Sequence, residues 1–247
     1  MTRRLAAVAA AALGGALLFA VPAAAQSLNI DLGKISGQET GHILELIALI
    51  TVLSIAPGIL IMVTSFTRIV VVLSFLRSAL GTQQTPPNMV MVSLALFLTA
   101  FIMAPVAQKS YDDGIAPLIA NQIDGAEAFK RSTAPLADFM LRQVREQDLK
   151  LFYDLSKTPI PATAQQTPLK VLIPAFMISE LRRAFEIGFL IFLPFLVIDM
   201  VVASVLMSMG MMMLPPVMIS LPFKIIFFVL VDGWYLVAGS LVQSFGT

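Results

Sequence analysis

The chain alternates between long apolar runs and short polar breaks. A helix needs roughly twenty apolar residues to cross the hydrocarbon core of a bilayer. Runs of about this length occupy residues 46–63, 89–106, 187–209 and 225–245, and the first contains Pro57, which kinks a helix that includes it. Residues 81–88 separate two runs and have the composition of a turn, with two prolines. The pattern predicts an all-α integral membrane protein of kinked helical hairpins.

Acidic and basic residues alternate along residues 109–170, in contrast to the apolar runs. Within this segment, residues 134–155 carry apolar side chains at helical spacing among the charges, which favours an amphipathic helix. Between Glu45 and Asp112 every charged residue is basic. Because basic loops tend to face the cytoplasm, the segment 109–170 is predicted to lie on the non-cytoplasmic side of the membrane.

Residues 1–25 have the three parts of a secretory signal peptide, namely a basic start, an apolar core and an end of small residues. The alanines before Gln26 match a cleavage site, so cleavage is predicted between Ala25 and Gln26. An uncleaved membrane anchor is the alternative. After cleavage, residues 26–40 would form a short exported segment and residues 41–247 a single helical domain.

The composition agrees with a membrane protein and excludes several functions. Hydrophobic residues make up 58% of the chain and charged residues 13%, against about 45–50% and about 25% in soluble domains. The net charge of +1 gives no electrostatic basis for binding nucleic acid. Cysteine is absent and His42 is the single histidine, which excludes thiolate chemistry and paired-histidine zinc motifs. We therefore expect no catalytic residue, metal site or cofactor, and no enzyme activity.

A methionine-rich break separates the last two apolar runs. Residues 204–221 contain six methionines, and Pro215 and Pro216 force the chain to turn or break there. Methionine is flexible and polarizable, so it fills irregular gaps and adapts to changing partners. Two interpretations remain open at this point: a soft plug that closes a pore, and ordinary packing of a tight membrane turn.

Two charges lie within the apolar runs on either side of this break. Asp199 and Lys224 are equally far in sequence from the centre of the break, so the antiparallel legs of a hairpin would bring them to one level. A charge at membrane depth costs about 2.5–3.5 kcal/mol, which favours pairing. The sequence predicts a buried ion pair, either within one chain or between neighbouring subunits. The alternative is that Lys224 reaches to an interface while Asp199 faces water.

A second charged cluster precedes the third apolar run. Its members are expected on a helix surface, where residues three or four apart are neighbours and where they could also bridge subunits. They are Glu180, Arg182, Arg183 and Glu186.

Several segments are similar to one known family. SELRRAF at 179–185, GFLIFLPFLVIDM at 188–200, MSMGMMMLPP at 207–216 and LPFK at 221–224 resemble the FliP family, as does the segment 57–81. The resemblance covers nearly all of the chain after the signal peptide.

The resemblance implies an all-helical core subunit of the flagellar type III export gate, a pore for unfolded flagellar subunits in the bacterial inner membrane and basal body. It implies a homopentamer with FliQ and FliR, acting with FlhA and FlhB, whose apolar runs can be buried in the assembly as well as in lipid. It also implies a pore gasket of four methionines, Met209, Met211, Met212 and Met213.

The sequence leaves two other classes of function open. A secondary transporter or channel for a small solute would place Asp199 and Lys224 at a substrate or proton site, but inverted repeats are not visible. A membrane protease would need a nucleophile such as Ser220 activated by Lys224. Pro222 between these two residues and the lack of a nearby oxyanion feature disfavour that reading.

Overall fold

The computed structural model describes residues 37–82, 84–211 and 214–246, and these ranges contain helices, turns and loops but no strand. The all-α prediction is therefore confirmed for the described part of the chain. The elements, in chain order, are α2 (Gly37–Met62), α3 (Phe66–Leu80), α4 (Asn88–Ser110), the π-helical turn η1 (Tyr111–Ile115), α5 (Ala116–Ile119), α6 (Gly125–Gln143), α7 (Glu146–Ser156), the 3₁₀ turn η2 (Ala164–Gln166), α8 (Leu169–Ser208), α9 (Pro216–Leu230) and α10 (Gly233–Gln243).

The predicted signal peptide and its cleavage site at Ala25 and Gln26 lie outside the described residues. The chain divides into two compact units, Met1–Thr51 and Val52–Thr247. All packing, hydrogen bonds and cavities described below belong to the second unit.

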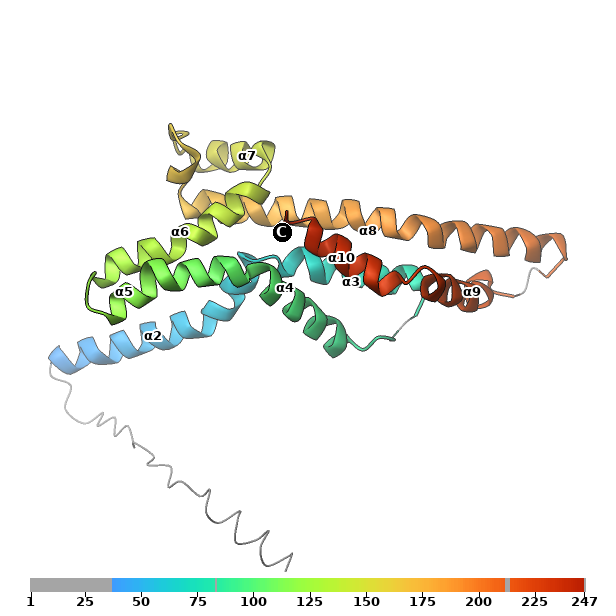
Figure 1. Cartoon of the computed structure of the whole chain (residues 1–247), viewed down its shortest axis with the longest axis horizontal. Helices are drawn as coiled ribbons and strands as arrows, with labels where there is room; N and C mark the ends of the chain where they lie inside the picture. The colour runs from blue at the N-terminus through green and yellow to red at the C-terminus, as the bar shows by residue number, and fades with distance from the viewer. Residues whose placement is uncertain (1–36, 83, 212–213, 247) are drawn as a thin grey trace, which may run out of the picture. The chain divides into compact units, whose positions relative to one another are not determined.

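Helix α3 forms the centre of the core. Its buried apolar residues recur three and four positions apart, which gives it an apolar face against α4 and α8. The approach to α8 is close at Gly188, where an added Cβ would lie 2.5 Å from the Phe75 ring. Figure 1 shows α3 alongside the much longer α8. The buried residues contributed by α3 include Ile69, Val72, Leu73, Leu76, Ala79 and Leu80.

Helix α8 is longer than any apolar run in the sequence suggested. It is 40 residues long, or about 60 Å, and continues through Pro174 and Pro194. The predicted run 187–209 is therefore only its second half, because the charged residues before it continue the same helix. Many apolar side chains of that half are exposed, including Phe189, Leu190 and Val201. Such a surface requires lipid or other protein to cover it.

Among the described residues, two helical segments are long and apolar enough to cross a membrane, Asn88–Ile119 and Leu169–Ser208. The helices α9 and α10 would make a third only if they act together as a span bent by 63°. The predicted run 225–245 is therefore broken, because Asp232 adopts a left-handed conformation with φ of 52° and Gly233 lies against the Phe228 ring. The first run lies in α2, where the apolar stretch Leu46–Ile59 is shorter than a full span.

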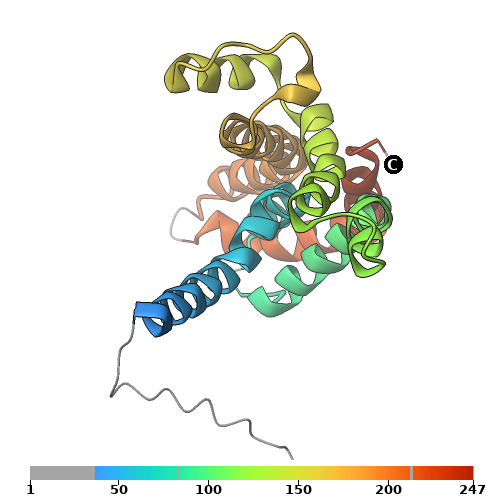
Figure 2. The same cartoon turned by 90° about the vertical axis from the view of Figure 1, so that its left-hand side faces the viewer.

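The charged segment forms η1, α5, α6, α7 and η2. The single amphipathic helix predicted over 134–155 is wrong, because α6 ends at Gln143 and α7 begins at Glu146. Between them the backbone is extended, and the Arg145 N–H donates to Ser179 Oγ on α8 at 3.0 Å. The Ser179 hydroxyl in turn donates to Asp148 of α7 at 2.7 Å. These contacts place α6 and α7 on two sides of the N-terminal half of α8, as Figure 2 shows.

Candidate functional site: two ion pairs and a methionine-rich tip

Helix α8 supplies two carboxylates to contacts with other helices, one fully buried and one partly buried. Glu180 and Asp199 lie 19 positions apart in sequence, which corresponds to about 28 Å along the helix axis. Each carboxylate meets a cation from a different helix, Arg68 of α3 and Lys224 of α9. Helix α8 is therefore attached to its neighbours by charge at two separate levels.

The first ion pair is fully enclosed. Arg68 Nε donates to Glu180 Oε2 at 2.8 Å, and Nη2 donates to Oε1, so the contact is bidentate. The side chains are 1% and 0% exposed. Arg68 Nη1 also donates to the Ser244 carbonyl at 3.1 Å and to Ser244 Oγ at 3.0 Å, and the guanidinium lies 3.8 Å from the centre of the Phe245 ring.

This arrangement gives Arg68 a second role at the end of α10. The last carbonyls of a helix lack partners within the helix and carry partial negative charge, so a cation there is stabilising. Ser244 is the residue that follows α10, and its carbonyl accepts a hydrogen bond from the Arg68 guanidinium. Burial lowers the pKa of Arg68, while the hydrogen bonds that it donates to Glu180 oppose the shift. An arginine remains charged at neutral pH.

Gln143 links the first ion pair to α6. Its Oε1 accepts from Arg68 Nη2 at 3.0 Å and from Arg183 Nη1 at 3.1 Å. Its Nε2 donates to the Phe245 carbonyl at 3.3 Å. The cluster therefore joins α3, α6, α8 and the segment after α10, and the buried polar groups partner one another, which such groups require in a dry interior.

The second ion pair joins α3, α8 and α9. Lys224 Nζ lies 2.6 Å from Asp199 Oδ2, and the Ser220 hydroxyl donates to Asp199 Oδ1 at 2.5 Å. Lys224 Nζ also donates to the Ala79 carbonyl at 3.1 Å, in the last turn of α3. The Lys224 side chain is 3% exposed and that of Asp199 29%. This lysine therefore pairs with a carboxylate and caps a helix, as Arg68 does.

The methionine-rich tip begins where α8 ends. Gly210 has a φ of 73°, its N–H donates to the Met207 carbonyl, and the Met211 N–H donates to the Leu206 carbonyl at 3.0 Å. These two bonds form a Schellman motif, in which a left-handed glycine closes a helix. Met209, the residue at the helix end, is 62% exposed. Gly210 thus ends α8.

The prolines act on the other side of the tip. Pro215 precedes α9, and Pro216 is the first residue of that helix. Proline suits this position because the N–H that it lacks would have no partner within the helix. Of the four predicted gasket residues, Met212 and Met213 lie outside the described residues.

Comparison with known proteins identifies the family. Residues 49–241 match the FliP family. The chain belongs to the FliP family. It is 63% identical over 235 residues to the flagellar biosynthetic protein FliP of Caulobacter vibrioides, covering 95% of this chain and 88% of that protein. It is also 58% identical over 201 residues to the flagellar biosynthetic protein FliP of Bacillus subtilis, covering 81% and 91%.

The matched FliP region contains both ion pairs and the methionine-rich tip. It ends before Ser244 and Phe245, which complete the Arg68 cluster. The family resemblance that the sequence predicted is confirmed, and this FliP-family chain is a flagellar biosynthesis protein with apolar helices suited to a membrane.

The structure brings together Asp199 and Lys224, as the sequence predicted. The pairing of Ser220 with Lys224 as a nucleophile receives no support, because the Ser220 hydroxyl donates to Asp199 and to the Val217 carbonyl. The prediction that Glu180 lies on a helix surface or between subunits is wrong. Its carboxylate is buried inside the chain because Arg68 lies opposite it.

The other members of that charged cluster have separate partners. Arg182 and Glu186 form an exposed pair at 3.0 Å, four residues apart on α8, whereas Arg183 donates to Gln143. Sequence reasoning did not select Arg68 as a site residue. The available signal was a pair of basic residues, Arg68 and Arg77, within the otherwise apolar, helical stretch 64–80.

Proposed function

We propose that this chain is a core subunit of the flagellar type III export gate, and that copies of it surround the pore through which unfolded flagellar subunits leave the cytoplasm. One observation carries the proposal: the methionine-rich tip stands on a helical hairpin whose legs are held together by the Asp199–Lys224 pair. Membership of a family of flagellar biosynthetic proteins supports the same assignment.

The hairpin suits a gate because its rigid and soft parts are separated. Asp199 lies about 14 Å along α8 from the helix end at Ser208. The Asp199–Lys224 ion pair therefore holds the two helices together at a distance from the tip, and the tip extends beyond the pair. Methionine side chains at the tip can seal against ions and still adapt to exported segments of many sequences. In the mechanism we propose, Met209, Met211, Met212 and Met213 from each copy close the pore.

The exposed apolar surface of the hairpin supports assembly with other subunits. A groove of about 570 Å³ between α8 and α9 is lined by apolar residues such as Val201, Leu206 and Phe223. Neighbouring subunits or lipid must cover such a surface. We propose that five copies of this chain form a homopentamer, which assembles with FliQ and FliR and acts with FlhA and FlhB.

We infer that the assembly lies in the bacterial inner membrane within the flagellar basal body, with the N-terminus on the periplasmic side. This location requires the predicted signal peptide to direct export. N-terminal sequencing of the mature protein is expected to begin at Gln26. Recovery of Met1 in the assembled protein would show that the segment is an uncleaved anchor.

The decisive experiment changes the bulk of the tip. Replacing Met211, Met212 and Met213 with alanine shortens the side chains in every subunit, so we expect ion leakage through the membrane and altered secretion of flagellar subunits. Replacement by leucine keeps bulk and apolarity but reduces flexibility, so we expect a sealed gate with slower secretion. Membrane conductance and secretion are measured together.

The matched control is Met200→Ala, which shortens an exposed methionine on the α8 leg away from the tip. This control is expected to leave conductance unchanged. If the triple alanine variant neither leaks nor alters secretion, the tip methionines serve only as ordinary packing and do not seal a pore. A transporter that binds a solute between Asp199 and Lys224 is less well supported, because these groups already bind each other, Ser220 and the Ala79 carbonyl.

A further inference from the structure

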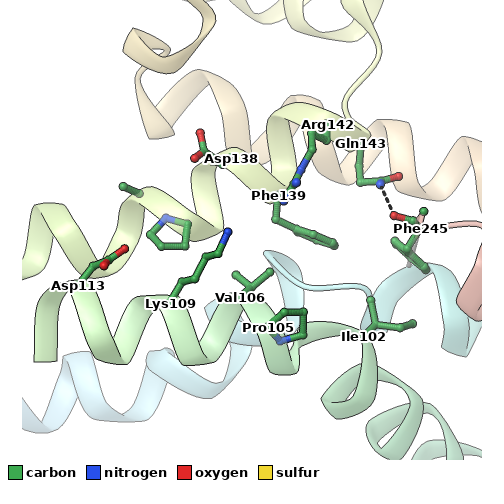
Figure 3. A pocket seen from close by; sticks show the side chains of 13 residues that line it. Ile102, Pro105, Val106, Lys109, Asp113, Asp138, Phe139, Arg142, Gln143 and Phe245 are labelled. Atoms are coloured by element: carbon green, nitrogen blue, oxygen red, sulfur yellow. Dashed lines mark hydrogen bonds between the residues drawn. The ribbon is translucent and has the colours of Figure 1, made fainter. Parts of the chain in front are cut away.

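A cavity separate from the hairpin lies between α4, α6 and the segment after α10. Its volume is about 700 Å³, within the range of about 300–1,000 Å³ typical of ligand pockets. Buried apolar side chains form its inner wall, including Ile102, Val106, Phe139 and Phe245. Figure 3 shows these residues below and beside the Gln143–Phe245 hydrogen bond that closes one end.

Four charged side chains surround the outer part of this cavity. Lys109 of α4 and Arg142 of α6 supply two cations, and Asp113 of η1 and Asp138 of α6 supply two carboxylates. All four are exposed, and within the described part of the chain none of them forms an ion pair. In Figure 3 the Lys109 side chain extends from α4 toward α6. These four residues form the rim of the cavity, which therefore combines two cations and two carboxylates that are not paired with one another.

A π-helical turn holds one wall of the cavity in place. Such turns occur mostly as single insertions in α-helices and are frequent at functional sites. Here η1 carries Asp113, and the next residue, Gly114, lies so close to α6 that an added Cβ would be 2.0 Å from Ser132 Oγ. The contact fixes η1 against α6, so the carboxylates of Asp113 and Asp138 are held on a common rim.

The cavity lies at the end of an apolar, membrane-length helix. Residues 88–108 carry no charge, and Lys109 in the last turn of α4 is the first charged residue after them. Basic side chains at the ends of such helices reach the level of lipid headgroups. On the N-terminal side of Pro105 along α4, Phe97 and Phe101 are exposed. They share a helix face with Pro105, which lines the cavity.

We propose that this cavity binds a phospholipid whose headgroup carries both a phosphate and a primary ammonium, as phosphatidylethanolamine does. Arg142 and Lys109 hold the phosphate, and Asp113 and Asp138 accept hydrogen bonds from the ammonium. One acyl chain follows the apolar wall onto the exposed face of α4. The zwitterionic headgroup matches the neutral balance of the rim, and this inference does not depend on the export function.

The test measures lipid binding to the full chain, purified with its partner subunits in mild detergent. Native mass spectrometry counts bound dioleoyl phosphatidylethanolamine during titration, beside dioleoyl phosphatidylglycerol, which lacks the ammonium. The Arg142→Gln variant is expected to weaken binding of both lipids about tenfold, because a charge-assisted hydrogen bond is lost. The Asp138→Asn variant is expected to weaken only the ethanolamine lipid.

The matched control is Lys130→Gln, which removes an exposed cation of α6 that does not line the cavity. This variant is expected to bind as the unchanged protein does, and circular dichroism checks that every variant is folded. Equal loss in the control and the rim variants would overturn the proposal, as would an unchanged lipid preference in Asp138→Asn. Equally tight binding of water-soluble glycerophosphoethanolamine would also overturn it, because the acyl chain would then contribute nothing.

Discussion

Replacing Glu180 with glutamine is expected to destabilise the protein strongly, because the change keeps the side-chain shape and removes only the charge. Arg68 would then remain as a cation in a site where it is 1% exposed. Removing one partner of a buried ion pair costs about 3–5 kcal/mol. In a chain of this size about 1 kcal/mol corresponds to roughly 2–4 °C in Tm. The expected decrease in Tm is therefore about 6–20 °C.

The assay is thermal unfolding of the detergent-purified protein, followed by tryptophan fluorescence at one scan rate for all variants. Arg182→Ala is the control on the same helix, since it breaks an ion pair whose side chains are 57% and 60% exposed. Pairs of this kind contribute about 0.3–0.5 kcal/mol, so the control should shift Tm by no more than about 2 °C.

The double variant Arg68→Met with Glu180→Leu tests whether Glu180→Gln destabilises the protein by leaving Arg68 as an uncompensated buried charge or by removing the ion pair as such. Replacing both charges by apolar groups removes the uncompensated cation, so the double variant is expected to be more stable than Glu180→Gln. It should still be less stable than the unchanged protein, because the Ser244 carbonyl loses the hydrogen bond from Arg68 and Gln143 loses one of the two donors to its Oε1. The reasoning fails if Glu180→Gln unfolds within about 2 °C of the unchanged protein. It also fails if the double variant is less stable than Glu180→Gln.

Two further predictions concern other contacts of α8. Asp199→Ala and Lys224→Ala should each impair assembly or export, because the first leaves the buried Lys224 without its counter-charge and the second does the same to the partly buried Asp199. The charge-swapped double variant should recover part of the loss, and additive losses in secretion assays would contradict this coupling. Gly188→Ala should lower stability by about 1–3 kcal/mol in the same thermal assay, since the new methyl group would lie 2.5 Å from the Phe75 ring, whereas Gly239→Ala meets open space and should be neutral or stabilising.

Much of the fold was determined by local features of the sequence. The apolar runs predicted helices because side chains that share one face of a helix recur three or four residues apart. The pairing of Asp199 with Lys224 was also predictable. The methionine-rich break marks the turn of a helical hairpin, and residues at equal distances from the turn lie at the same level on the two antiparallel helices. The family motifs gave the assignment to the FliP family, since they are long and uninterrupted.

Other features depended on contacts between distant parts of the chain. Glu180 could not be separated from its neighbours Arg182 and Arg183 by sequence, because all three lie on one charged turn and only the position of α3 decides which is buried. The division between α6 and α7 likewise arises from Ser179, which binds the backbone N–H of Arg145.

The cavity with the charged rim also depends on contacts between distant parts of the chain. Lys109 and Arg142 are ordinary surface residues in the sequence, and their common cavity exists only because α4 and α6 pack together. The sequence by itself therefore determined the helical class, the family and the level of one ion pair, all of which follow from spacing along the chain. Tertiary structure decided which charges are buried and which surfaces form cavities, because both depend on which helices lie side by side.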